Sequence, residues 1–190
     1  MKIVPLNNDY YMFIDNTPKA ITLYERYHWR AHKDKDGSVY ACARIWLPGN
    51  RQKRIRFHRE LVGAAKGQLV DHRNHDTLDN QEHNLRKCND AQSTQSRRPF
   101  KGRKFKGVNL HSQIDKWWVR VKANKQSSYL GCFNDLEDAL LAYNREAALL
   151  HGEFAVLNDL SDREAIKQFE QEARARKAER GPNYGETKPL

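Results

Sequence analysis

LVDHRNHDTLDNQEHNLRKCNDAQ, residues 69–92, decides the fold of this 190-residue chain. Residues 69–72 and 85–88 are short runs that predict strands, and the segment between them is rich in the Asn and Asp residues that build turns. Asn89, with Gln92 three residues later, predicts an N-cap and capping box for a helix over 89–98. The stretch therefore predicts a strand, a loop, a strand and a helix, in that order.

Asp71 and His72 in this stretch are residues of the types that phosphodiester hydrolysis needs. A neutral imidazole can take a proton from an attacking water near neutral pH. A hard divalent cation held by carboxylate and amide oxygens can stabilise the departing 3′ oxygen. Adjacent strand residues point to opposite faces, so Asp71 can hold the cation while His72 faces the water.

VDHRNHDTLDNQEHNLR (70–86), preceded by FHRELVGAAKG (57–67), resembles the HNH homing endonucleases of phages. The resemblance implies a ββα-metal finger with His72 as general base and Asp71 as first metal ligand. It implies that Asn84 braces the loop and orients the histidine. The HR segment at 58–59 matches the residues that precede the finger in this family.

The third position of the HNH pattern departs from the family. The resemblance places Ser93 where the family carries an Asn or His metal ligand, and Asn89, one helical turn earlier, is the alternative. A serine oxygen binds Mg²⁺ more weakly than an amide oxygen does. The cofactor that the resemblance implies is Mg²⁺, with Mn²⁺ as an alternative.

Residues 103–158 predict three strands and a helix. The strands are expected over 108–112, 117–122 and 128–133, and the helix begins at Asn134-Asp135 and ends at Gly152. The helix has one apolar stripe. In the middle strand, alternation turns Trp117, Val119 and Val121 toward this helix and Trp118, Arg120 and Lys122 away from it. The predicted outward face is aromatic and basic.

The same residues resemble the DNA-binding domain of plant ethylene-response factors, through KGVNL (106–110), WWVRVK (117–122), YLGCF (129–133) and the helix sequence that follows. In that family the three-stranded sheet lies in the major groove of DNA. Together with Arg103, the candidate DNA-binding residues are Lys106, Asn109, His111, Lys116, Trp118, Arg120, Lys122, Ser127 and Tyr129.

The charge distribution supports a polyanionic partner. The chain has 34 Lys and Arg against 24 Asp and Glu, a formal net charge of +10. Residues 97–134 hold ten of the basic residues, including Lys101 and Lys104, and one acid, Asp115, which is a net +9. Such a segment, interleaved with aromatic residues, favours nucleic acid as partner. The alternative is a solvated basic face.

The fold class expected is α+β in four regions. These are a small β-rich module at 1–57, the HNH ββα-metal nuclease at 58–98, the sheet-and-helix DNA-binding domain at 99–158, and a charged, solvated or loosely docked helix with a disordered tail at 159–190. In the first region, strands are expected over 2–6, 10–14, 39–47 and 54–58.

The expected function is a Mg²⁺-dependent endonuclease that nicks double-stranded DNA. Three separated cysteines and the lack of a long apolar run favour a cytoplasmic protein with no membrane partner. The resemblance to phage endonucleases implies that this cytoplasm is that of a bacterial host cell during phage infection. A monomer is expected, with a dimer on DNA as alternative.

Alternative functions are a non-catalytic DNA-binding protein and an RNA-binding module. Alternatives for the central stretch are a structural polar loop and a zinc site of His72, His75, His83 and Cys88.

Overall fold

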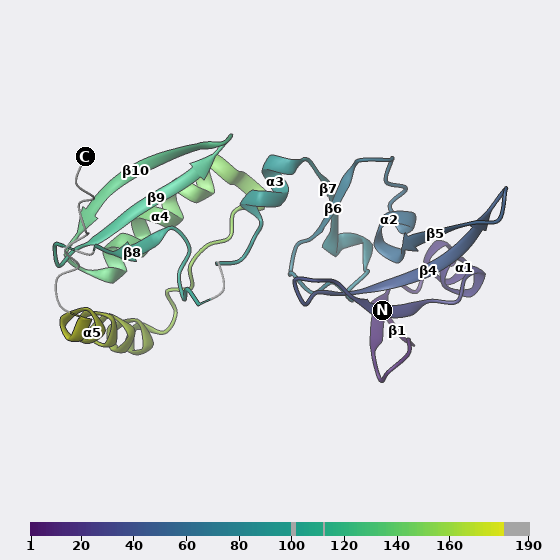
Figure 1. Cartoon of the computed structure of the whole chain (residues 1–190), viewed down its shortest axis with the longest axis horizontal. Coiled ribbons are helices and arrows are strands. Elements are labelled where there is room, and N and C mark those ends of the chain that lie inside the picture. Colours follow the sequence, from purple (N-terminus) through teal and green to yellow (C-terminus); the bar gives the residue numbers. More distant parts are fainter. Residues whose placement is uncertain (100–101, 112, 181–190) are drawn as a thin grey trace, which may run out of the picture. The chain divides into compact units, whose positions relative to one another are not determined.

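The computed structural model describes residues 1–99, 102–111 and 113–180 (Figure 1). It divides into two compact units, Met1–Ser93 and Thr94–Leu190, called here the first and the second unit. Both combine helices with small antiparallel sheets, so the predicted α+β class is confirmed. Among the described helices, none has the length and apolar character needed to cross a membrane. The tail predicted to be disordered, 181–190, lies outside the described residues.

The first unit contains three sheets. Two of them are two-stranded, β1 with β2 and β6 with β7, and the third has the order β3-β4-β5. In chain order the elements are β1 (Lys2–Pro5), β2 (Tyr11–Ile14), α1 (Pro18–Arg26), β3 (Arg30–Lys33), β4 (Val39–Leu47), β5 (Arg51–Arg56), α2 (Phe57–Leu61), β6 (Leu69–His72), a 3₁₀ turn (Glu82–Asn84), β7 (Leu85–Cys88) and α3 (Asp90–Gln95), the last of which runs past the unit boundary.

Strand β4 matches the expected strand at 39–47, because its alternation of small apolar and polar residues is regular. The partner strand ends at Arg56 rather than residue 58, since Phe57 and His58 begin α2. Helix α1 and strand β3 were not predicted. The signals for α1 were present, because Thr17 caps the helix, accepting from Ala20 N at 3.4 Å, and proline follows it.

One apolar core unites the predicted regions 1–57 and 58–98, so the expected boundary at residue 57 does not separate two bodies. The buried residues of this core come from both regions: Val4, Met12, Ile14, Ala20, Trp29, Ala41, Ala43, Ile55, Phe57, Leu61 and Leu85. Region 1–57 supplies nine of these residues and region 58–98 supplies Leu61 and Leu85, so the second region packs onto the core of the first.

The second unit is a three-stranded antiparallel sheet with helices α4 and α5. Its sheet order is β10-β9-β8, so β8 is an edge strand. The elements are β8 (Val108–Leu110), β9 (Trp117–Ala123), β10 (Gln126–Phe133), α4 (Leu136–His151), a 3₁₀ turn (Gly152–Phe154) and α5 (Arg163–Arg180). The three predicted strands and the helix are confirmed, although residue 112 of the first strand lies outside the described residues. Asp135 is the N-cap of α4 and makes no side-chain cap hydrogen bond, so the capping box that Asn134-Asp135 and Glu137 predict does not form.

The core of the second unit lies between the sheet and both helices. Val119 and Val121 of β9 are buried against Leu136, Leu140 and Tyr143 of α4, as the alternation predicted. Helix α5 also docks here, because Ile166 is 4% exposed and Phe169 packs on the same cluster. The expectation of a solvated or loosely held helix is therefore corrected: its two large apolar side chains, spaced by three, pack against the core.

Candidate functional site

Asp71 and His72 end strand β6 and point to opposite faces of its two-stranded sheet. The register places Asp71 opposite Arg86 and His72 opposite Leu85. The Arg86 guanidinium donates to Asp71 Oδ2 from Nε at 2.9 Å and from Nη2 at 2.7 Å. These are charge-assisted hydrogen bonds in a partly buried setting, and they fix the orientation of the carboxylate.

Asn84 braces the loop between the two strands. Its Oδ1 accepts from Asn74 N at 3.0 Å, and its Nδ2 donates to Asp79 O at 2.8 Å. Its own carbonyl accepts from Arg73 N at 2.9 Å. These three bonds brace the loop, as the family resemblance implied. None of them involves His72, so the implied orientation of the histidine by Asn84 stays a prediction.

The same loop is tied to strand β2. Phe13 N donates to Leu78 O at 2.9 Å, and Asn80 N donates to Phe13 O at 2.7 Å. Asp79 accepts from Asn74 Nδ2 at 2.7 Å and from Gln81 Nε2 at 2.9 Å. The Asn and Asp residues of the loop thus serve its shape, as in the alternative of a structural polar loop, and they hold the end of β6 in place.

His72 is enclosed by rings, and the side chain of the loop residue Asn80 lies close enough to affect its pKa. Its side chain is 4% exposed, its ring centre lies 5.0 Å from that of His58 and 6.3 Å from that of Tyr40, and the His58 contact is edge-on. The Nε2 atom of His72 is buried and has no hydrogen-bond partner among the described residues. A buried polar atom without a partner is costly, which is why such atoms in native proteins point to a functional role or to a bound water or ion.

Both buried histidines are held neutral. Burial lowers the pKa of His72, and the opposing effects of the Asn80 side chain and of the Asp71, Asp76 and Asp79 carboxylates do not outweigh it. Burial lowers the pKa of His58 to about 2, with smaller contributions from the charge that His72 would carry if protonated and from the charges of Arg56 and Arg59. A neutral imidazole can accept a proton, so His72 is in the protonation state that a general base requires.

The stability of the first unit is therefore expected to fall in mild acid. His58 in the unfolded chain binds a proton as the pH drops below about 6.5, but His58 in the folded protein does not. Its contribution to the free energy of unfolding is therefore fully present above that pH and decreases as the pH falls below it. The free energy of unfolding should be at least about 1.4 kcal/mol lower at pH 5.5 than at pH 7.5. Urea unfolding at both pH values measures this. His58→Gln should remove much of the difference, and His83→Gln, at an exposed position, should leave it unchanged.

The predicted metal ligands are placed on two elements. Asp71 lies on β6, and Ser93 is half-buried within α3, where its N–H donates to Asn89 O at 2.9 Å. The alternative ligand, Asn89, is engaged in a reciprocal cap, because its Oδ1 accepts from Gln92 N and its N–H donates to Gln92 Oε1, both at 2.9 Å. The capping box is confirmed. Because the Asn89 side chain is used in this cap, Ser93 is the more available of the two candidate metal ligands.

The oxygen donors of Asp71 and Ser93 fit a hard cation such as Mg²⁺, which commonly uses one or two carboxylates together with substrate phosphate. Arg86 already donates to Asp71 Oδ2, so a cation there would compete with a guanidinium. In the described part of the chain, no three His, Cys, Asp or Glu side chains form a group that could hold a metal. The zinc alternative, His72 with His75, His83 and Cys88, is not assembled as such a group.

The outer face of sheet β8–β10 carries most of the predicted DNA-binding residues. Directly opposed residues share a face, and the register joins Asn109 with Trp118, Arg120 with Tyr129, and Lys122 with Ser127. The Arg120 guanidinium lies 4.6 Å from the centre of the Trp118 ring, and Tyr129 is 58% exposed. The result is an exposed, basic and aromatic surface, with the apolar core on its other side.

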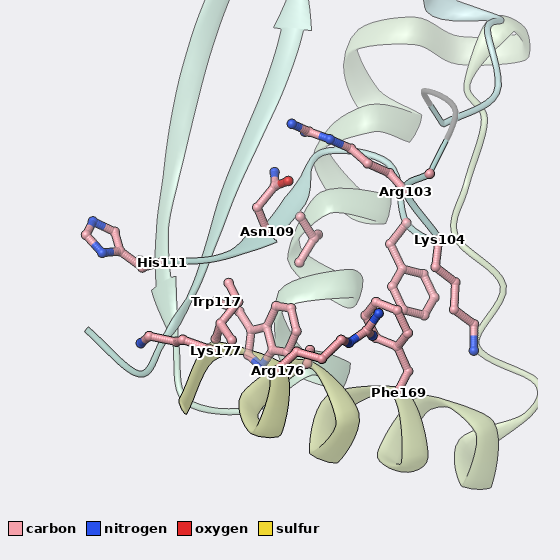
Figure 2. A pocket seen from close by; sticks show the side chains of 13 residues that line it. Arg103, Lys104, Asn109, His111, Trp117, Phe169, Arg176 and Lys177 are labelled. Atoms are coloured by element: carbon pink, nitrogen blue, oxygen red, sulfur yellow. The ribbon is translucent and has the colours of Figure 1, made fainter. Parts of the chain in front are cut away.

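A pocket of about 370 Å³ lies beside edge strand β8 (Figure 2). Arg103, Asn109 and His111 line it from the sheet side, and Arg176 and Lys177 line it from α5. Trp117 from β9 and Phe169 from α5 also line this pocket, as Figure 2 shows. Arg176 and Lys177 were not predicted as site residues, because α5 carries charges on most sides and the sequence does not show which of them meet the sheet.

Two predicted DNA-binding lysines have different surroundings. Lys116 is exposed just before β9. Lys106 is turned away from the outer face, because its ammonium donates to Gln95 O and, at 2.7 Å, to Arg97 O. Burial lowers the pKa of Lys106 to about 8. Its role in this structure is to hold the segment before β8, and it is not placed in the exposed surface.

Comparison with known proteins found no matching family model, no similar curated protein and no similar solved structure. The candidate site therefore rests on its own geometry. That geometry joins a neutral, enclosed imidazole to an adjacent carboxylate in the first unit, and it places a basic-aromatic sheet face in the second.

Proposed function

We propose that the protein is a Mg²⁺-dependent endonuclease that binds duplex DNA and hydrolyses a phosphodiester bond. The observation that carries this proposal is the neutral His72, with its unpartnered Nε2 atom, next to Asp71 on β6. The proposed ββα-metal finger consists of β6, β7 and α3, which follow each other in the expected order.

In the proposed reaction, His72 takes a proton from a water at Nε2 as the water oxygen attacks phosphorus. The bond from phosphorus to the 3′ oxygen breaks, and this oxygen takes a proton from solvent water, which leaves a 3′ hydroxyl and a 5′ phosphate. His72 then releases its proton to solvent. Asp71 and Ser93 would hold the cation, which when bound supplies positive charge to the departing oxygen. Arg86 holds the Asp71 carboxylate in position, and Asn84 holds the loop that leads away from His72.

His72 Nε2 is buried, so the side chains over it must move for a water to reach this atom. Tyr40 is half-buried and covers His72 together with His58. Its displacement when DNA binds would admit water to a base that is otherwise protected. Catalytic contacts often form fully only in the substrate complex.

Relaxation of supercoiled plasmid tests the proposal. With Mg²⁺, the full-length protein should convert supercoiled DNA to open circles, because one site with one base cleaves one strand in each engagement. With EDTA the plasmid should stay supercoiled. If no relaxation occurs with Mg²⁺ or Mn²⁺ on any of several DNAs, including phage DNA, the enzymatic proposal fails.

The second candidate is a DNA-binding protein without catalysis. Two observations favour it: Arg86 already neutralises Asp71, and His72 is 4% exposed. It predicts the same binding surface and tight binding to duplex DNA without cleavage. Competition between duplex DNA and single-stranded RNA separates either DNA function from RNA binding, since an aromatic-basic sheet can also stack single-stranded bases.

Under both candidates, replacing Arg120 and Lys122 together by alanine should weaken duplex binding by about 10- to 100-fold at moderate salt. The slope of log affinity against log salt should fall by about 2, because each lost phosphate contact accounts for roughly 0.9 of that slope. Fluorescence anisotropy with a labelled duplex in EDTA measures both quantities. Arg145→Ala with Lys167→Ala removes the same charge from exposed positions of α4 and α5. An equal effect of the two pairs would show that the sheet face is not the binding surface.

A further inference from the structure

The first unit has a second basic surface, on the sheet β3-β4-β5. The register places Arg44 opposite Arg54, and it places Arg30 and Arg56 on either side of Cys42. Because opposed residues share a face, these four arginines lie on one side of the sheet. We call this side the arginine face; it consists of Arg30, Arg44, Arg54 and Arg56, with Tyr40 and Trp46. The other side carries Ala41, Ala43 and Ile55, which are buried in the core.

The arginine face has an excess of positive charge. Arg56 is paired with Asp34, from Nη2 to Oδ2 at 2.8 Å, and Arg54 Nη1 lies 2.6 Å from His32 Nε2. A pocket of about 430 Å³ on this part of the sheet is lined by Arg30, Arg44 and Arg54, with His28 and His32, and none of its lining residues is acidic. Three guanidinium groups around one hollow form a site for an anion with several oxygens, such as a phosphodiester.

Arg44 and Arg54 are opposed like charges, which costs up to about 1 kcal/mol in a sheet. An anion that lies across the two strands would convert this repulsion into attraction. Trp46, the next outward residue on β4, is 65% exposed. An exposed indole beside arginines adds a ring that can pack on sugars or bases, as in nucleic-acid surfaces.

The arginine face is connected to the candidate base, His72, through the Tyr40 ring. The Arg56 guanidinium lies 4.6 Å from the centre of the Tyr40 ring, and Tyr40 in turn lies against His58 and His72. Arginine face, Tyr40 and His72 are therefore contiguous within one unit. A phosphate backbone on this face would run toward the His72 imidazole and would contact the ring that covers it.

We propose that the arginine face binds the sugar–phosphate backbone of duplex DNA next to the bond that is cut. This inference rests on the proposed function and adds a second DNA surface to that of sheet β8–β10. Backbone contacts of this kind position a duplex without reading its sequence. The face would thus place the scissile strand against His72, and the other sheet would contribute the larger share of selectivity.

The test compares two double variants of the full-length chain. Arg44→Ala with Arg54→Ala removes two charges from the arginine face. Arg51→Ala with Lys53→Ala removes two charges from the same hairpin, but alternation places these residues on the opposite side of β5. In EDTA, with a labelled duplex, the first pair should reduce affinity at least about tenfold and lower the salt slope by about 2, while the control changes the slope by less than about 0.5.

A stability measurement separates binding from folding. Because Arg44 and Arg54 repel each other, the first double variant should unfold at the same urea concentration as wild type or a higher one. Reduced affinity in a protein of undiminished stability supports a binding role. Equal affinity losses for the two pairs would show an effect of net charge alone and overturn the proposal, as would loss of affinity only to heparin and not to duplex DNA.

Failure of this inference differs from failure of the proposed function. If wild type binds duplex DNA but never nicks it, the endonuclease proposal fails, and the binding comparison still decides the arginine face. If wild type nicks and the Arg44/Arg54 variant binds and nicks equally well, the arginine face proposal is overturned alone. If wild type does not bind duplex DNA, both are overturned.

Discussion

Replacing His72 by alanine is expected to slow plasmid nicking by between about 100- and 10,000-fold, the usual range for removal of a general base. The reason is that Nε2 of His72 is the proposed proton acceptor, and it is neutral and unpartnered among the described residues of the folded protein. Duplex affinity should stay close to that of wild type, because the exposed arginines and lysines that we propose bind phosphate are unchanged.

The controls for this variant address folding, since His72 is buried against His58. His72→Gln keeps more of the side-chain volume and should nick as poorly as His72→Ala. His83→Ala makes the same truncation at an exposed position of the neighbouring loop, and it should nick like wild type. Urea unfolding of each variant shows whether the assay contains folded protein. Nicking by His72→Gln at the wild-type rate would remove His72 from the mechanism.

Replacing Gly107 by alanine is expected to destabilise the second unit by about 3 kcal/mol or more. Gly107 has a φ of +73°, and a Cβ atom there would overlap the Tyr143 ring and lie 2.5 Å from Arg120 O. Neither neighbour can yield easily, because Tyr143 is fully buried and Arg120 O belongs to the central strand. Gly107 O also accepts from Arg120 N at 2.8 Å, so the position couples the segment before β8 to the basic strand.

Gly102→Ala is the matched control for this change. Gly102 has a φ of +87°, and a Cβ atom added there would meet no atom of the described residues within 4 Å, so its substitution should cost only the backbone term of about 1 kcal/mol. Urea unfolding followed by tryptophan fluorescence compares the two variants, since Trp117 and Trp118 report on this sheet. Equal destabilisation would show that close packing at Gly107 is not the cause.

Regular alternation and helical periodicity predicted the parts of the fold that depend on local sequence. Strands β4, β9 and β10 and helix α4 follow such patterns, and they were found close to their predicted bounds. Strand β3 escaped prediction because Arg-Ala-His-Lys has no apolar side chain larger than alanine, and its strand conformation comes from pairing with β4. Tertiary pairing of this kind leaves no local signal.

The candidate site was predictable in its adjacent residues but not in its surroundings. The order of Asp71, His72 and Asn84 is visible in the sequence, and so is the capping pair Asn89 and Gln92. The enclosure of His72 by Tyr40 and His58 is not, because these rings come from β4 and α2. For Lys106, by contrast, the sequence suggested a role that differs from its position in the structure. Its place in a basic run suggested DNA contact, and two backbone carbonyls determine its position instead.

The measurement that tests the central claim most directly records DNA binding and nicking in the same samples, for wild type and His72→Ala, with Mg²⁺ and with protein in excess over a supercoiled plasmid. The claim is that the neutral imidazole of His72 activates the water that cuts DNA. It predicts equal fractions of bound plasmid, with open circles accumulating for wild type and supercoiled DNA persisting for His72→Ala. Equal amounts of open circles at equal binding, or none for either protein, would contradict it.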